Sequence, residues 1–297
     1  MAQERFFPPI NFAAIPEEYA RFERAHVVIL PVPYGSTVSG RAGCREGARA
    51  IIEASEEMEL YDFDLECEPY RVGIHTLPEV MPHTGDPQAM VERMAEIVGE
   101  LVDGGKLVAT LGGEHTLAVG AVRAYRQRVD SLSVLALDAH ADLRQEYLGT
   151  PYNHACVLRR LLDDGCPLVQ VGLRSATREE HDLIRQRKLP FFSIQAYRAL
   201  AGDPREVLSR LSENVYVTID LDVFDPSQMA AVGTPEPGGL LWDEVVGLLA
   251  AVAREKRIVG FDVTELAPRL GPFANAQLAA RLAYRLIGLA VADPERP

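Results

Sequence analysis

Four strand-like apolar runs, each followed directly by acidic or histidine residues, constrain the fold of this chain most strongly. The runs cover residues 107–111, 132–137, 215–219 and 258–261. Runs that are apolar throughout are typical of strands in a parallel sheet buried on both faces. Helical patterns separate them, among others over residues 86–102, 178–187, 204–212 and 274–291. We therefore expect an α/β fold of three α/β/α layers around a mainly parallel sheet.

The chain has no internal break that would divide it. Its 297 residues contain no repeat, low-complexity tract or Ser/Gly-rich linker, so we expect a single domain over residues 1–297. Residues 1–16 carry Pro and Phe and are expected to form an N-terminal arm over the surface or a subunit contact, and residues 293–297 a polar tail. No apolar stretch approaches the roughly 18 residues of a membrane helix, and the first residues lack a signal-peptide pattern. These features predict a cytoplasmic protein.

Charge and cysteine content exclude several classes of partner and site. The net charge of −13 argues against nucleic acid and anionic membranes as partners and favours a cationic ligand. The four cysteines form no CxxC pair. They therefore predict reduced thiols rather than a disulfide framework or a zinc site.

Carboxylates and imidazoles follow the strand-like runs in four motifs, which are GGEH (112–115), DAHAD (138–142), DLD (220–222) and TE (264–265). Alternate side chains of an extended segment share a face, so Asp138, His140 and Asp142 are expected to point to one place. Asp220 and Asp222 repeat this spacing, and His115 adds a second imidazole. Parallel strands carry their active sites at their carboxyl ends, which predicts that the motifs converge. We interpret Asp225-Pro226, just behind the DLD motif, as a structural turn.

This inventory predicts two divalent metal ions. A structural zinc ion usually takes four ligands rich in Cys or His. Six ligands that are mostly oxygen suit two hard or borderline ions such as Mn²⁺, although nickel, cobalt or iron would suit similar ligands. Four aspartates also balance the charge of two such ions. Two metals about 3.5–4 Å apart lower the pKa of a bridging water toward about 7, which predicts hydrolysis of a poor electrophile.

Taken together, the motifs resemble those of the ureohydrolase family of arginases and agmatinases. The resemblance extends over residues 32–55 (VPYGSTVSGRAGCREGARAIIEAS), NHACVLRR (153–160), GTPEPGG (233–239) and GFDVTELAP (260–268). The agmatinase branch looks closer than arginase, because NHACVLRR and MELYDFDL (58–65) resemble bacterial and archaeal agmatinase-like sequences. The resemblance implies a single arginase-like domain with two Mn²⁺ ions, assembled as a homotrimer or homohexamer.

The resemblance also implies a role for each residue of the motifs. One manganese would be held by His115, Asp138, Asp142 and Asp220, and the other by Asp138, His140, Asp220 and Asp222. His154 and Glu265 would be the catalytic and substrate-binding residues. A carboxylate such as Glu265 can accept two parallel N–H bonds from a guanidinium group. A histidine such as His154 can protonate the departing amine.

At two places the sequence departs from the family's usual pattern, which leaves the identity of the substrate undecided. Residues 143–147 lack the arginase-like Asn, which argues against L-arginine. Arg144 in that stretch is suited to binding a carboxylate, or alternatively to pairing with Glu146 or another acid. Ala230-Ala231 stands where Pro-Gly is common, which leaves the substrate's length open.

Three functions follow from these patterns. The first is a manganese-dependent hydrolase in polyamine biosynthesis that converts agmatine or aminopropylagmatine to urea and putrescine or spermidine. The second is the same chemistry on a guanidino or formimino acid. The third is a non-catalytic regulator, which would be marked by lost metal ligands. All six ligands are intact, which favours an enzyme.

Overall fold

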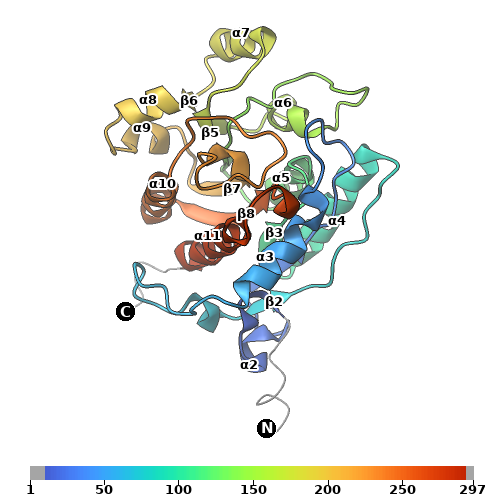
Figure 1. Ribbon diagram of the computed structural model, residues 1–297, viewed down its shortest axis with the longest axis vertical. Coiled ribbons are helices and arrows are strands. Elements are labelled where there is room, and N and C mark those ends of the chain that lie inside the picture. Colours follow the sequence, from blue (N-terminus) through green and yellow to red (C-terminus); the bar gives the residue numbers. More distant parts are fainter. Residues whose placement is uncertain (1–10, 292–297) are drawn as a thin grey trace.

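A single sheet of eight parallel strands organises the structure, a computed structural model that describes residues 11–291. Every neighbouring pair of strands is parallel, and their order across the sheet is β2-β1-β3-β8-β7-β4-β5-β6. The strands are β1 (Val27–Pro31), β2 (Ile74–Thr76), β3 (Leu107–Leu111), β4 (Leu132–Leu137), β5 (Leu168–Leu173), β6 (Phe191–Ser193), β7 (Asn214–Asp220) and β8 (Arg257–Thr264). The predicted α/β fold with a parallel sheet is confirmed (Figure 1).

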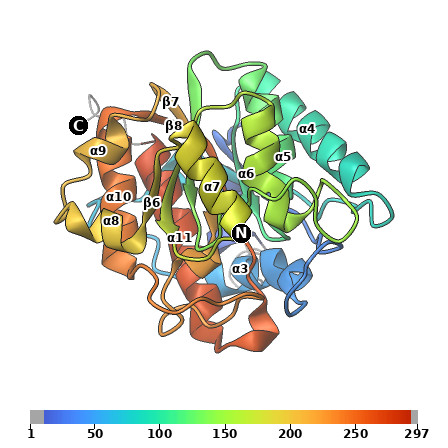
Figure 2. The same ribbon diagram turned by 90° about the horizontal axis from the view of Figure 1, so that it is seen from above.

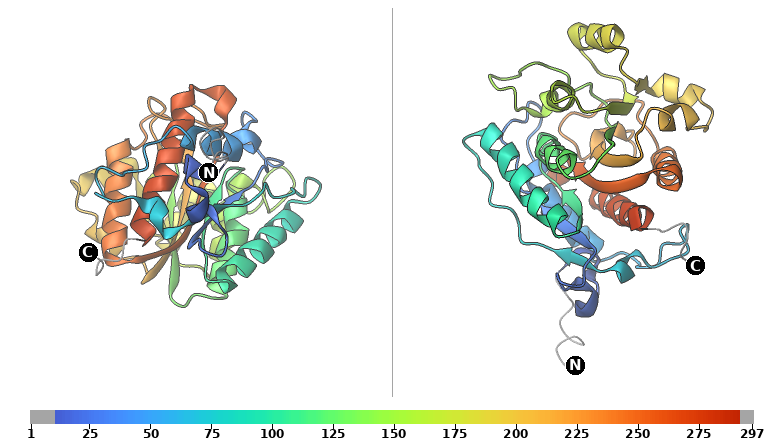
Figure 3. Two further views of the ribbon diagram at one scale, coloured as in Figure 1. Left: turned by 90° about the horizontal axis from the view of Figure 1, so that it is seen from below. Right: turned by 180° about the vertical axis from the view of Figure 1, so that it is seen from behind.

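Helices cover both faces of this sheet. The described helices are α2 (Glu17–Ala20), α3 (Gly47–Ser55), α4 (Pro87–Asp103), α5 (Leu117–Arg126), α6 (Val157–Asp163), α7 (Arg178–Arg187), α8 (Ile194–Ala199), α9 (Arg205–Leu208), α10 (Trp242–Glu255) and α11 (Phe273–Val291). Seen from above, α4, α5 and α6 lie together on one side of the sheet and α10 and α11 on the other (Figure 2). Views from below and from behind show the same separation of the green helices from the orange and red ones (Figure 3). None of these helices combines the length and the apolarity needed to span a bilayer.

The two helical layers pack on alternate residues of the same strands. In β4, Leu135 and Leu137 join the core under α3, α10 and α11, whereas Val134 and Ala136 join the core under α4, α5 and α6. All six residues of β4 are buried. Burial on both faces explains why the central strands are apolar throughout.

The four strands that precede the predicted motifs are neighbours in the middle of the sheet. β3, β8, β7 and β4 follow one another, and their carboxyl ends are level, since Leu111 pairs with Val263 and Leu137 with Ile219. The loops that leave these ends therefore meet at one edge. Tight packing at that edge requires glycine after β3, where Gly112 has a φ of 79° and any Cβ would lie 2.3 Å from the Ala48 nitrogen.

A few elements differ from the expectation. The helix expected over residues 204–212 is confined to α9 (Arg205–Leu208), and α8 and the edge strand β2 are additional short elements. Within the expected N-terminal arm, Phe12 and Ile15 are buried in the core rather than lying over the surface. Residues 1–10 of that arm and the predicted tail at 293–297 lie outside the described residues.

Candidate metal centre and active-site pocket

The six predicted metal ligands come together at the carboxyl end of the central strands. The ring nitrogen Nδ1 of His115 lies 3.3 Å from Asp138, 3.2 Å from Asp142 and 3.8 Å from Asp220, each measured to Oδ2. His115 lies in the loop after β3, Asp138 and Asp142 lie in the loop after β4, and Asp220 is the last residue of β7. One imidazole nitrogen thus faces three carboxylates from two other strands.

A second group of ligands adjoins the first and shares Asp138. His140 Nδ1 lies 2.8 Å from Asp222 Oδ2 and 3.9 Å from Asp138 Oδ1. The potential ligand atoms of His115, Asp138 and Asp220 all lie within 4.8 Å of one another, as do those of Asp138, His140 and Asp222. The two groups form adjacent candidate cation sites with Asp138 between them.

The electrostatics of the cluster fit divalent cations. Asp138 is fully buried, and its Oδ2 has no hydrogen-bond partner among the described residues. Burial, with the nearby Asp142 and Asp222 charges, raises the pKa of Asp138 to about 7. Burial and the charges of Asp222 and Asp138 also raise the pKa of Asp220 well above its ordinary value. Buried carboxylates that crowd one another in this way need positive charge to stay ionised.

Behind His115, a chain of hydrogen bonds holds the ring from its other nitrogen. His115 Nε2 lies 2.8 Å from Thr218 Oγ1, and this hydroxyl donates to Asp262 Oδ1 at 2.6 Å. The other oxygen of Asp262 accepts from the hydroxyl of Tyr216 at 2.9 Å. Thr218 and Asp262 are fully buried. A metal-binding histidine is commonly oriented by such a partner on its second nitrogen, so these residues fix the direction in which Nδ1 points.

The loop that carries Asp142 is tied to the start of α7. Asp142 has a left-handed φ of 50°, and the next backbone N–H, that of Leu143, donates to Glu180 Oε1 at 2.9 Å. Glu180 Oε2 accepts from the N–H of Thr177 at 2.8 Å, closing a capping box at the helix N-terminus. The buried Glu180 carboxylate therefore holds together the Asp142 turn and one wall of the site.

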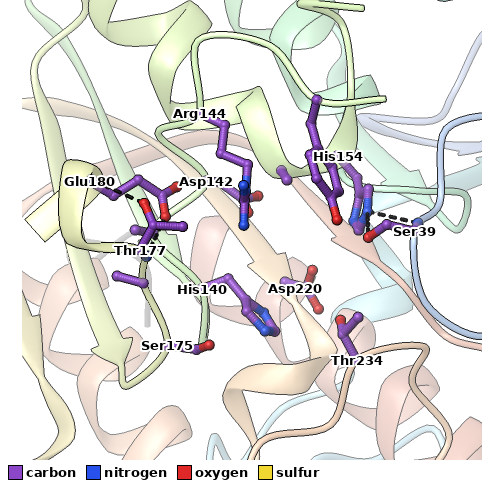
Figure 4. A pocket seen from close by; sticks show the side chains of 14 residues that line it. Ser39, His140, Asp142, Arg144, His154, Ser175, Thr177, Glu180, Asp220 and Thr234 are labelled. Atoms are coloured by element: carbon purple, nitrogen blue, oxygen red, sulfur yellow. Dashed lines mark hydrogen bonds between the residues drawn. The ribbon is translucent and has the colours of Figure 1, made fainter. Parts of the chain in front are cut away.

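A pocket of about 260 Å³ opens over the cluster. Its base includes His140, Asp142 and Asp220, while His115, Asp138 and Asp222 lie behind that base. The remaining lining is mostly polar and comes from several loops; it includes Ser39, Arg144, Tyr147, His154, Ser175, Thr177, Glu180 and Thr234. Figure 4 shows His140 and Asp220 in the centre, with His154 and Ser39 to one side.

The two residues expected to act on the substrate, His154 and Glu265, lie close together beside the metal ligands. His154 Nδ1 is 4.0 Å from Glu265 Oε1. Glu265 is buried, has a left-handed φ of 66°, and accepts the backbone N–H of His115 at 2.8 Å. Burial, aided by the Glu114 charge, raises the pKa of Glu265 to about 8, whereas burial lowers the pKa of His154. Glu265 is set deeper than His154, since it is not part of the pocket lining.

Arg144 points into the pocket without an acidic partner. Its guanidinium carbon lies 4.4 Å from the centre of the Tyr147 ring, a cation–π contact. Within residues 11–291 it forms no ion pair with Glu146 or any other acid. The pairing considered as one alternative from the sequence is therefore absent, and the positive charge faces the site (Figure 4).

Sequence reasoning missed several residues that support the site, namely Ser39, Thr218, Glu180 and Asp262. Asp262 carried a signal, because it is an acid inside an otherwise apolar strand, and buried charges are rare without a partner. Glu180 carried another, because it stands three residues after Thr177 in a capping-box pattern. Ser39 and Thr218 had no signal that separates them from ordinary hydroxyl residues.

Comparisons with known proteins agree with this geometry. The model of the arginase family matches residues 25–288. An N(1)-aminopropylagmatine ureohydrolase of Thermus thermophilus is 41% identical over 273 residues, which cover 92% of this chain and 93% of the relative. A protein of the same name from Synechocystis is 36% identical and covers 94% of this chain and 96% of its own length. Among solved structures, the agmatine ureohydrolase of Thermoplasma volcanium matches with a TM-score of 0.87 and 31% identity, covering 97% of both chains.

Proposed function

The chain belongs to the arginase family and is therefore a hydrolase of the ureohydrolase type, and we propose that it converts agmatine, or agmatine extended by an aminopropyl group, to urea and a polyamine. The main support is that carboxylate oxygens of three aspartates lie within 4 Å of one ring nitrogen of His115, beneath a polar pocket. The extended substrate is included because the relatives at 41% and 36% identity are named for it.

The cofactor of this proposal is a pair of Mn²⁺ ions. His115, Asp138, Asp142 and Asp220 would hold one ion, and Asp138, His140, Asp220 and Asp222 the other. The Asp138 Oδ2, which accepts no hydrogen bond within residues 11–291, and the crowding of four buried carboxylates support this assignment. When bound, two such ions would supply a water whose pKa is lowered toward about 7.

Glu265 would orient the guanidinium group of the substrate. Its Oε1 already accepts the His115 N–H, but each carboxylate oxygen has a second lone pair for an incoming N–H donor. Burial makes the charge of this carboxylate more effective than it would be in water. A guanidinium held at Glu265 would place its carbon between the ligand cluster and His154.

His154 would supply a proton to the amine as it leaves. A guanidinium carbon is a weak electrophile, and its amine leaves only when it is protonated. His154 borders the pocket, and its Nδ1 faces the Glu265 side of the site. The polar Ser175, Thr177 and Thr234 side chains at the pocket wall would accommodate the hydrogen-bonding tail of the substrate.

The proposal is tested by measuring urea release after preincubation with Mn²⁺. The substrates are agmatine, aminopropylagmatine, arginine, guanidinobutyrate and guanidine. Turnover of agmatine or its extended form, and not of arginine, is expected. Absence of urea from every amine substrate, in protein shown to contain metal, would reject the proposal. We also propose a homotrimer or homohexamer, which light scattering after size-exclusion chromatography would measure.

A second candidate function is favoured by Arg144, which forms no ion pair with an acid among residues 11–291. A cation in the pocket wall attracts a carboxylate, so the same chemistry would act on a guanidino or formimino acid. Under this alternative, Arg144→Ala raises KM for guanidinobutyrate at least 10-fold and leaves KM for agmatine unchanged or lower. Arg178→Ala is the matched control, because Arg178 is exposed near the same wall but does not line the pocket. Equal effects of both substitutions on the acid would reject the alternative.

A further inference from the structure

We infer that Ser39 sets the tautomer of His154 and connects it to solvent as a proton relay. This inference deepens the proposed function and rests on it, because it concerns the source of the proton that His154 gives to the departing amine. The proposal is carried by two contacts to one ring nitrogen and by the anchoring of the loop that makes them.

Both contacts from Ser39 reach Nε2 of His154. The backbone N–H of Ser39 donates to Nε2 at 3.0 Å, and the Ser39 hydroxyl oxygen lies 2.8 Å from the same nitrogen. A backbone N–H can only donate, so Nε2 must carry a lone pair. The single proton of the neutral ring then lies on Nδ1, the nitrogen that faces Glu265. The backbone of Ser39 thus holds His154 in the form that presents N–H to the active site.

The position of Ser39 is fixed by its neighbour Thr37. The Thr37 N–H and hydroxyl both donate to the buried Glu114 carboxylate, at 2.8 Å and 2.5 Å. The Thr37 hydroxyl in turn accepts the backbone N–H of His154 at 3.2 Å, and the Thr37 carbonyl accepts from Asn153 Nδ2 at 2.9 Å. Glu114, the acid of the GGEH motif, therefore anchors this loop against the segment that carries His154.

The other end of the loop is held as well. The N–H of Arg41 donates to the Gly233 carbonyl at 3.2 Å, and a Cβ on Gly40 would lie 2.7 Å from that oxygen. Gly40 therefore admits no larger residue without movement of the loop. Ser39 lies between two fixed points, so its contact with His154 is not a chance contact of a free surface loop.

Ser39 is also the outward-facing member of the pair. It is an exposed residue, whereas the side chain of His154 is only 12% exposed. Figure 4 shows Ser39 on the side of His154 away from His140 and Asp220. The path from solvent to the site therefore runs through the Ser39 hydroxyl, then Nε2, then Nδ1.

The protons that pass along this relay balance over one turnover. In the inward step, Nδ1–H gives its proton to the departing amine, Nε2 takes the hydroxyl proton of Ser39, and Ser39 takes a proton from solvent. In the outward step, after the products have left, Nδ1 takes a proton from the water that replaces the one consumed, Nε2–H returns its proton to the Ser39 oxygen, and Ser39 releases one to solvent. The Ser39 N–H opposes a proton on Nε2 between these steps, which favours return to the starting tautomer.

Ser39→Ala is the decisive variant, because it removes the hydroxyl and keeps the backbone N–H that sets the tautomer. We expect kcat to fall about 10-fold to 100-fold, within the range of general acid–base contributions. We expect KM and the Mn²⁺ concentration for half-activation to stay unchanged. Imidazole added as a small proton carrier should restore part of kcat in Ser39→Ala and should not accelerate the parent. Ser39→Thr should keep at least half of the parental kcat.

Ser36→Ala is the matched control, because Ser36 is exposed in the same loop and does not line the pocket. A kcat for Ser39→Ala within twofold of this control would overturn the relay, as would a loss that imidazole does not restore. Neutron diffraction of the parent gives an answer that does not depend on activity: hydrogen on Nδ1 supports the inference and hydrogen on Nε2 alone refutes it. Failure of the parent itself to release urea from any guanidino compound would instead reject the proposed function.

Discussion

Replacing Glu180 with alanine should weaken both the fold and the metal centre, although Glu180 is not a predicted ligand. The residue is 6% exposed, and its carboxylate accepts two backbone N–H groups, those of Leu143 and Thr177. The first of these follows Asp142 directly, at a left-handed turn. Loss of the carboxylate leaves the turn without the contact that opposes its strain.

The size of the effect follows from these two contacts. A buried N–H left without an acceptor costs about 1–3 kcal/mol, and the N–H of Leu143 is buried. Loss of the Glu180 half of the capping box, with the Thr177 cap retained, costs up to about 1 kcal/mol more. Glu180→Ala should therefore destabilise the protein by about 2–4 kcal/mol, and Glu180→Gln, which keeps one acceptor oxygen, by about 1–2 kcal/mol. For a chain of 297 residues, 1 kcal/mol corresponds to about 2 °C in Tm.

The assay has two parts and an internal control. Denaturant unfolding of the metal-free protein measures the free energy, and Mn²⁺ titration of urea release measures the midpoint of activation. The midpoint should rise about 10-fold in Glu180→Ala, as expected for loss of a residue that orients a ligand. Glu179→Ala removes the neighbouring exposed acid from the same helical turn and should change the free energy by less than about 0.5 kcal/mol. If Glu180→Ala and Glu179→Ala behave alike in both assays, the reasoning fails.

Three further predictions concern the metal centre and its surroundings. Thr218→Val removes the hydroxyl between His115 and Asp262 and should weaken Mn²⁺ binding, measured by calorimetry, about 10-fold to 100-fold. Thr218→Ser keeps the hydroxyl and should keep the parental affinity. Equal Mn²⁺ affinities of the two variants would count against the hydrogen-bond chain. Chelation should abolish urea release and lower Tm, and Mn²⁺ at 100 times its Kd should restore about 2.7 kcal/mol per site; a Tm indifferent to metal would contradict the site. Gly113→Ala should destabilise the protein by at least about 1–2 kcal/mol in denaturant unfolding, since Gly113 has a φ of 73° and a Cβ would meet the Val32 carbonyl at 2.8 Å. A variant with parental stability would show that the turn relaxes without cost.

The main helices and strands and the predicted ligands could be predicted from the sequence because they depend on short-range patterns. The helix at 178–187 has Thr177 as its cap, and its bounds were predicted without error because capping is a local interaction. The meeting of the six predicted ligands could be foreseen because each lies at the end of a buried strand or in the loop that follows it, and parallel strands present their carboxyl ends at one edge.

The parts that escaped prediction depend on contacts distant in sequence. Nothing near Ser39 indicates that it lies against His154, which is 115 positions away. The burial of Phe12 depends on its packing against the core that contains α11, and β2 is an edge strand of only three residues. The order of strands across the sheet is equally non-local, because β3 pairs with β8 rather than with β4, the next strand in the chain.

That strand order has a consequence for how the protein is made. Among the described strands, β8 is the last in the chain, and it alone joins β2-β1-β3 to β7-β4-β5-β6. A ribosome that has released the first 256 residues has therefore produced both parts of the sheet but not the strand between them. His115 and Asp220 lie on opposite sides of that gap, so they come together only after β8 has been inserted. A truncated product without β8 would carry all six predicted ligands but could not bring His115 to the aspartates, so the complete cluster of predicted ligands forms only in the nearly complete chain.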